Sequence, residues 1–218
     1  MIVEFAGPSA VGKSSISKEL AIRLAEQGTD AWVEPKPGSA WTRVRARDVA
    51  ASYRYARALG LGWKDGLARE VIDLAVAQAA LKQHRSLEGV VLSQGVARDL
   101  WLSCRRHDVS DEQRARAMEH LELPDAVVLL NVPDDERRKR STERGRVRSG
   151  VRFSKKRMYR MVVPEKDKTI SVDDSLAILE RALGRNHVPT LYLMNDGTVT
   201  EGASRVLDFL SGLDGAGF

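Results

Sequence analysis

Five short apolar runs alternate along the chain with longer stretches in which apolar residues recur every three or four positions. The runs predict strands over residues 2–6, 30–34, 89–93, 126–132 and 189–194. The helical spacing predicts helices over residues 14–27, 42–58, 66–86, 96–106, 111–121, 134–146, 172–184 and 200–211. Because strands that alternate with helices form βαβ units, we predict an α/β fold: a doubly wound, mostly parallel five-stranded sheet flanked by helices.

Prolines mark the ends of the predicted strands. Pro35 and Pro37 follow the second run, and Pro124 and Pro133 bracket the fourth. A linker rich in proline or glycine is not evident between the elements. We therefore expect a single domain over residues 1–218, with a flexible glycine-rich tail at 212–218.

The turn after the first predicted strand fits the phosphate-binding pattern G-x-x-x-x-G-K-[ST] from Gly7 to Ser14. In such a loop, glycines let backbone N–H groups surround a polyphosphate, the lysine reaches the outer phosphates and the hydroxyl binds Mg²⁺. A helix begins directly afterwards and points its positive end at the anion. The predicted ligands of ATP are Gly7, Ala10, Val11, Gly12, Lys13, Ser14 and Ser15, together with Arg137 and Arg146 from a later part of the chain, and Ser14 is also the predicted Mg²⁺ ligand. The alternative is a chance glycine-rich turn before a core helix.

Proteins with a parallel α/β sheet bind their ligands at the carboxyl ends of the strands. The polar residues at those ends are Glu34, Ser93 to Gly95, Asn131 and Asn195 to Gly197. Glu34 could accept the proton of an attacking hydroxyl, or it could be a solvated carboxylate beside a turn. Trp41 could stack on an acceptor's base or sugar, or anchor the core. Gln94 and Arg98 are further candidates to contact the acceptor, although Arg98 could equally face solvent.

A cationic stretch runs from residue 137 to residue 160. It holds twelve Arg and Lys residues against one Glu, a net charge of +11, which leaves −6 elsewhere in a chain of net charge +5. Such asymmetry favours a polyanionic partner, either a nucleotide or a nucleic acid backbone. Arg137, Arg140 and Arg144 share one helix face and can converge on a phosphoryl group. With small residues at 145, 149 and 150, we expect an arginine-rich lid rather than a passive basic surface.

Composition excludes several other classes. Cys104 is the only cysteine, so the chain has no internal disulfide, and we expect it to be buried filler. The sequence shows no signal peptide and no apolar run long enough to span a membrane, so we expect a cytoplasmic protein. Apolar helices next to the third strand leave a homodimer open.

At these positions the chain resembles the thymidylate kinase and deoxynucleoside kinase branch of the P-loop kinases. The likeness lies in the phosphate loop, in Glu34-Pro35, in the strand from Pro124-Asp125 to Pro133, and in Arg144-Gly145-Arg146. It implies that Glu34 is the base that activates the acceptor and that the lid arginines are Arg140, Arg144 and Arg146.

The resemblance also has departures. The third position of the loop is Ser9 where thymidylate kinases usually have Asp, and Ser93 stands where these families place an acidic residue. Mg²⁺ would then depend on Ser14, the phosphates, waters or a nearby carboxylate such as Glu4 or Asp99.

Three functions remain open from the sequence. The first is an ATP-dependent kinase that phosphorylates a nucleoside or nucleotide, with a hydroxyl favoured as acceptor because Glu34 offers a base. The second is a kinase that phosphorylates a hydroxyl carried by DNA or RNA, held by the 137–160 segment. The third is a nucleotide-binding regulatory protein without kinase activity.

Overall fold

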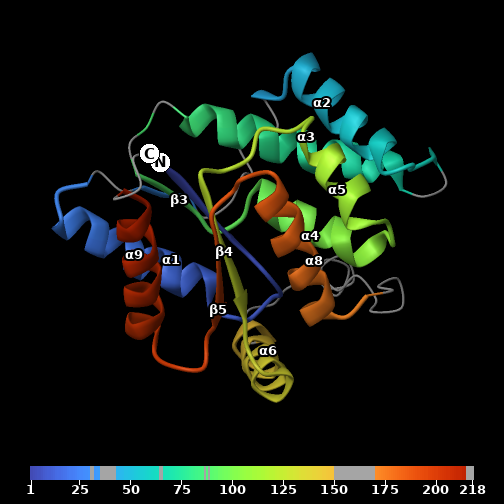
Figure 1. The fold of residues 1–218 in the computed structure, drawn as a ribbon. Coiled ribbons are helices and arrows are strands. Elements are labelled where there is room, and N and C mark those ends of the chain that lie inside the picture. Colours follow the sequence, from blue (N-terminus) through green and yellow to red (C-terminus); the bar gives the residue numbers. More distant parts are fainter. Residues whose placement is uncertain are drawn as a thin grey trace.

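Five parallel strands form one sheet in the order β2-β3-β1-β4-β5. A computed structural model describes residues 1–29, 32–34, 43–63, 66–85, 87, 89–149 and 170–214 (Figure 1). The strands are β1 (Ile2–Ala6), β2 (Trp32–Glu34), β3 (Val90–Leu92), β4 (Ala126–Asn131) and β5 (Thr190–Met194). The parallel α/β arrangement predicted from the apolar runs is confirmed.

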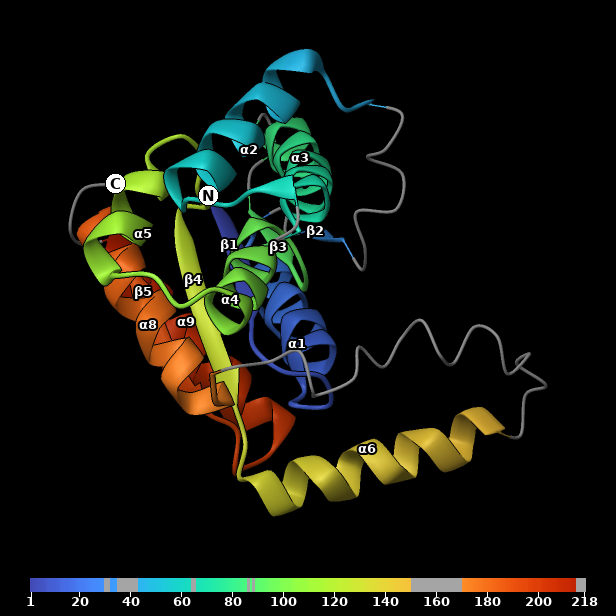
Figure 2. The same cartoon turned by 90° about the vertical axis from the view of Figure 1, so that its right-hand side faces the viewer.

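Helices cover both faces of the sheet. On one face lie α1 (Lys13–Glu26) and α9 (Val199–Asp214), which pack against each other. On the other side lie α2 (Ala46–Ala58), α3 (Leu67–His84), α4 (Val96–Arg106), α5 (Asp111–Met118) and α8 (Val172–Arg185). Helix α6 (Asp134–Ser149) follows β4 and projects away from the rest of the fold (Figure 2).

The strand side chains alternate between two apolar cores. Ile2 and Ala6 of β1 join the core beneath α3, α4 and α8, whereas Val3 and Phe5 join the core beneath α1 and α9. Strands buried on both faces are typical of parallel sheets covered by helices. Glu4 is the polar exception within β1, and it is fully buried.

Some element boundaries differ from the predictions. The tail was expected to begin at residue 212, but α9 continues to Asp214 because Leu210 and Leu213 still pack against the core beneath α1. Helix α2 begins at Ala46 rather than residue 42. Residues 215–218, Trp41 and the 150–160 half of the predicted lid lie outside the described residues.

The apolar helices proposed as a dimer surface are largely used within the chain itself. Leu74, Ala77 and Leu81 of α3 and Leu100 of α4 belong to the core beneath the sheet. Cys104 of α4 is buried as expected, and burial raises the pKa of its thiol to about 12. Across the described ranges, no helix is both long and apolar enough to cross a lipid bilayer.

Candidate nucleotide-binding site

The turn between β1 and α1 has the backbone curvature of a phosphate loop. Gly7, Ala10 and Gly12 have φ values of +129°, +68° and +98°. Left-handed residues turn successive N–H groups toward one side of a loop, which creates an anion-binding concavity. Gly7 also has no room for a side chain, because a Cβ atom there would overlap the carbonyl oxygen of Leu130 in β4. The sheet therefore requires glycine at the first position of the motif.

The first turn of α1 carries the polar groups of the motif. Lys13 folds back over the loop, where its Nζ donates hydrogen bonds to the carbonyls of Gly7 at 2.8 Å and Pro8 at 2.6 Å. Ser14 and Ser15 are exposed at the start of the helix. The first turn holds no acidic residue, so no carboxylate of the helix neutralises the positive end of its dipole. This helix end can accept an anion.

Asn195 contacts the phosphate loop from a distant part of the chain. This buried residue follows β5, and its Nδ2 donates a hydrogen bond to the Val11 carbonyl at 2.8 Å. A Cβ atom at Gly12 would lie only 2.6 Å from the same nitrogen. The sequence placed Asn195 at a strand end but gave no reason to connect it with the phosphate loop. That connection depends on the tertiary fold.

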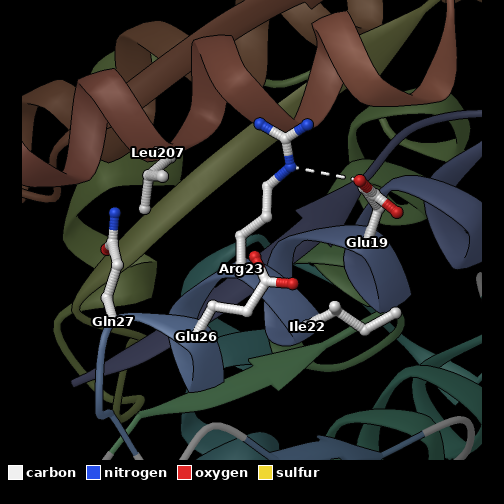
Figure 3. Close-up of a pocket in the computed structure, with 6 residues that line it drawn as sticks. All are labelled: Glu19, Ile22, Arg23, Glu26, Gln27 and Leu207. Carbon is white, nitrogen blue, oxygen red and sulfur yellow. Dashed lines mark hydrogen bonds and ion pairs between the residues drawn. The ribbon is translucent and has the colours of Figure 1, made fainter.

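A hollow of about 590 Å³ lies beside Asn195. It is lined by residues 194–198 and by Glu201, Gly202, Ser204 and Arg205 of α9. Because Asn195 both lines the hollow and contacts Val11, the hollow adjoins the phosphate loop. A second hollow, of about 450 Å³, lies further along α1 against α9 (Figure 3). There Arg23 is already bonded to Glu19 at 3.1 Å and to Ser204 at 2.7 Å.

Glu34 is the last residue of β2, and its backbone pairs in register with Leu92 of β3. Strand β3 lies between β2 and β1, so Glu34 ends its strand at the same sheet edge as the phosphate loop. The side chain of Glu34 lies outside the described residues, and so does all of Trp41.

The turn after β3 is organised by Glu4. The two carboxylate oxygens of Glu4 accept hydrogen bonds from the N–H groups of Val96 at 3.1 Å and Ala97 at 2.6 Å, at the start of α4. A Cβ atom at Gly95 would overlap this carboxylate. Burial raises the pKa of Glu4 to about 7, although the two backbone hydrogen bonds oppose the shift. Glu4 was expected only as a carboxylate near Mg²⁺, and the structure gives it the role of a helix cap.

The polar residues after β3, of which Gln94 and Arg98 were predicted to contact the acceptor, differ in their surroundings. Ser93 is buried and Gln94 is half-buried. Arg98 forms an ion pair with Asp99 at 2.7 Å, and its side chain is 39% exposed. Burial raises the pKa of Asp99 to about 6, while Arg98 opposes that shift. Arg98 is thus occupied by its neighbour in this conformation.

The first two lid arginines pair within their own helix. Arg137 contacts Asp134 at 2.5 Å and Arg140 contacts Glu136 at 2.8 Å, one turn earlier in α6. Arg144 and Arg146 lie further along α6, where the structure describes the backbone but not the side chains. Arg137 and Arg140 are therefore held by carboxylates of their own helix and not by the phosphate loop.

The part of the chain that the structure describes contains no group of three or more His, Cys, Asp or Glu residues arranged to hold a metal ion. The exposed hydroxyl of Ser14, next to a positively polarised helix end, fits a Mg²⁺ ion that arrives with a polyphosphate and takes most of its ligands from phosphate and water.

The sequence matches no protein-family model, and no curated protein shows significant sequence similarity to it. The fold, in contrast, is found in solved structures: it is the α/β fold of a deoxynucleoside kinase. Deoxyadenosine kinase from M. mycoides, solved with the products dCMP and a flexible dCDP, aligns over 97% of this chain and 100% of its own, with a TM-score of 0.56 and 16% identity. The same enzyme with dCTP gives a TM-score of 0.52 and 14% identity, and with dATP 0.51 and 16%, over the same shares of both chains. The resemblance predicted from the motifs is confirmed at the level of the fold.

Proposed function

We propose that this chain is an ATP-dependent P-loop kinase that transfers the γ-phosphoryl group to a hydroxyl of a nucleoside-type or nucleotide-type acceptor. The observation that carries the proposal is the left-handed turn from Gly7 to Gly12, which opens onto the start of α1 at the edge of a deoxynucleoside kinase fold. A turn of this shape followed by a helix N-terminus can bind polyphosphate through its backbone amides.

In this proposal the loop amides and Lys13 hold the β- and γ-phosphates. Lys13 would leave the carbonyls of Gly7 and Pro8 and bind phosphate oxygens, which are stronger acceptors because they are charged. Ser14 would ligate Mg²⁺, whose charge offsets that of the phosphates. The base of ATP would occupy the hollow between residues 194–198 and α9, because that hollow adjoins the loop.

The transfer would proceed in line. The acceptor hydroxyl oxygen bonds to the γ-phosphorus, the bond between that phosphorus and the bridging oxygen of ADP breaks, and the hydroxyl proton passes to Glu34. The position of Glu34 at the end of β2, on the same sheet edge as the loop, supports this role. Arg140 and Arg144, with Arg137 and Arg146, would neutralise the phosphoryl charge, once Arg137 and Arg140 exchange their carboxylate partners for phosphate.

The test uses γ-labelled ATP with nucleosides, nucleoside monophosphates and oligonucleotides as acceptors. Lys13→Ala should reduce transfer about a hundredfold or more, because it removes a charge aimed at the transferred group. Lys18→Ala is the matched control, since Lys18 is exposed on the same helix beyond the loop, and it should transfer at the unchanged rate. Equal activity of the two variants would refute the proposal.

A second candidate acceptor is a hydroxyl on DNA or RNA. The projection of α6, with seven Arg and Lys residues between Arg137 and Ser149, favours it, because such a helix can track a phosphate backbone. This candidate predicts salt-sensitive retardation of an oligonucleotide and transfer to it in preference to free nucleosides. Binding of ATP without transfer to any acceptor would instead favour a regulatory nucleotide-binding protein.

A further inference from the structure

Asn195 lies where the phosphate loop meets the ends of β4 and β5. Its side chain donates to the Val11 carbonyl at 2.8 Å, and its backbone N–H donates to the Asn131 carbonyl at 2.8 Å. The residue is only 5% exposed, and Val11 is fully buried. One asparagine therefore connects the loop to the neighbouring strands through a buried hydrogen bond.

The support for Asn195 is itself fixed. Asn131, at the end of β4, donates through Nδ2 to Asp173 at 2.5 Å and to the Tyr192 hydroxyl at 3.2 Å, and its Oδ1 accepts from the N–H of Val132 at 2.9 Å. These bonds join β4, β5 and the first turn of α8. The backbone of Asn195 is consequently anchored to the sheet rather than to a free loop.

The Val11 carbonyl determines the direction of the next N–H group. All peptide bonds within the described ranges are trans, and in a planar trans peptide the C=O and N–H groups point in opposite directions. A carbonyl held toward Asn195 therefore directs the Gly12 N–H away from Asn195. Gly12 precedes Lys13, and its φ of +98° belongs to the loop's left-handed turn.

We propose that Asn195 is a positioning residue of the phosphate loop, whose amide holds the Val11 carbonyl outward so that the Gly12 N–H faces the bound phosphates. The inference rests on the proposed nucleotide-binding function. Without the bond, the Val11–Gly12 peptide is free to rotate and the Val11 carbonyl loses its buried partner. The loop would then reach its binding shape only part of the time, so nucleotide affinity would fall.

The test measures the affinity of a fluorescent ATP analogue with Mg²⁺ together with chemical unfolding of each variant. Asn195→Ala should bind the analogue about tenfold more weakly. This is the effect expected when one buried hydrogen bond is lost and its partner is left unsatisfied. Asn195→Asp has the same size but sets a carboxylate oxygen against the Val11 carbonyl, and it should weaken binding further. In steady-state assays the KM for ATP should rise while the KM for the acceptor stays unchanged.

Asn186→Ala is the matched control. Asn186 also donates through Nδ2 to backbone carbonyls, those of Ala182 at 2.9 Å and Ala115 at 3.2 Å, but it joins α8 to α5. This variant should lose stability and keep the affinity within about twofold. The inference is overturned if both Asn195 variants bind like the unchanged protein, or if Asn186→Ala loses affinity equally. If Asn195→Ala does not fold, the inference is tested by Asn195→Asp alone, and affinity equal to that of the unchanged protein overturns it. If the unchanged protein binds no analogue, the proposed function itself fails, and the inference with it.

Discussion

The phosphate loop and α6 carry the two halves of the proposed chemistry, yet they are held in opposite ways. The loop is fixed by the sheet, because Gly7 fits against Leu130 and Val11 is bonded to Asn195. Arg137 and Arg140 of α6 are held by carboxylates one turn earlier in the same helix. Pairs of that kind contribute little to stability and exchange partners readily. The difference teaches that the proposed donor site is built into the fold, whereas Arg137 and Arg140 would have to change partners before they could act in the proposed transfer.

The largest expected effect comes from Gly7→Ala. The new Cβ atom would meet the Leu130 carbonyl while the residue is held at a φ of +129°, so we expect a loss of about 3 kcal/mol or more in the free energy of unfolding. Gly28→Ala is the control, because Gly28 has a φ of +85° with no atom within 4 Å of its Cβ position. It should cost about 1 kcal/mol. Similar losses in chemical unfolding would show that the sheet does not constrain the loop.

The second prediction concerns pH and the buried Glu4. Its pKa is about 7 in the folded chain against 4.5 when free, so the folded state binds the extra proton between these values. The contribution of Glu4 to the free energy of unfolding should therefore be most favourable below pH 4.5 and fall by about 3 kcal/mol as the pH rises through 7. Asp99, with its pKa raised to about 6, acts in the same direction.

Glu4→Gln is the variant that isolates this effect. Denaturant unfolding measured from pH 5 to pH 8 should show a flatter slope than the unchanged protein, since Gln does not titrate. Asp99→Asn serves as the companion, because it should remove only the contribution of Asp99. An undiminished slope in Glu4→Gln would mean that Glu4 is ionised throughout this range and that burial does not govern its pKa.

The third prediction separates α6 from the loop. Arg140→Ala should lower the rate of phosphoryl transfer about tenfold to a hundredfold while ATP affinity changes much less, because the arginine acts on charge that develops during transfer. Arg116→Ala is the control, since Arg116 forms a comparable pair with Glu112 at 2.5 Å on α5. Equal rates of transfer in the two variants would show that Arg140 of α6 takes no part in phosphoryl transfer.

The smallest effect is expected for Glu136→Gln. This change releases Arg140 from a half-buried pair within one helix, and the free energy of unfolding should change by less than about 0.5 kcal/mol. A loss comparable to that of Gly7→Ala would show that α6 is held as firmly as the loop, and it would end the contrast between the two regions.

The sequence predicted the sheet and the loop because both follow from local pattern. Apolar runs bounded by Pro124 and Pro133 locate β4, and the spacing of Ile16, Leu20 and Leu24 locates α1, whose buried face contains all three. The glycines of the motif likewise identify a left-handed turn without tertiary information. Such signals lie within a few neighbouring residues, so a single chain is enough to show them.

The contacts that join distant segments could not be predicted in this way. Asn195 is 184 positions from Val11, and Glu4 is 92 positions from Val96. A buried carboxylate in a strand or an asparagine after a strand has many alternative uses, and only the fold shows which backbone group it meets. The partners of Arg137 and Arg140 are local, because Asp134 and Glu136 lie three and four positions earlier in the same helix, but the arginines were considered only as groups for a phosphate.

The central claim is that the backbone amides of the turn after β1 enclose a triphosphate. Amide NMR spectra recorded during titration with Mg²⁺ and a non-hydrolysable ATP analogue test it most directly. The account predicts that the N–H resonances of Gly12, Lys13, Ser14 and Ser15 shift furthest while that of Gly28 stays in place. Unchanged resonances in the turn, or larger shifts at the hollow between α1 and α9, would contradict it.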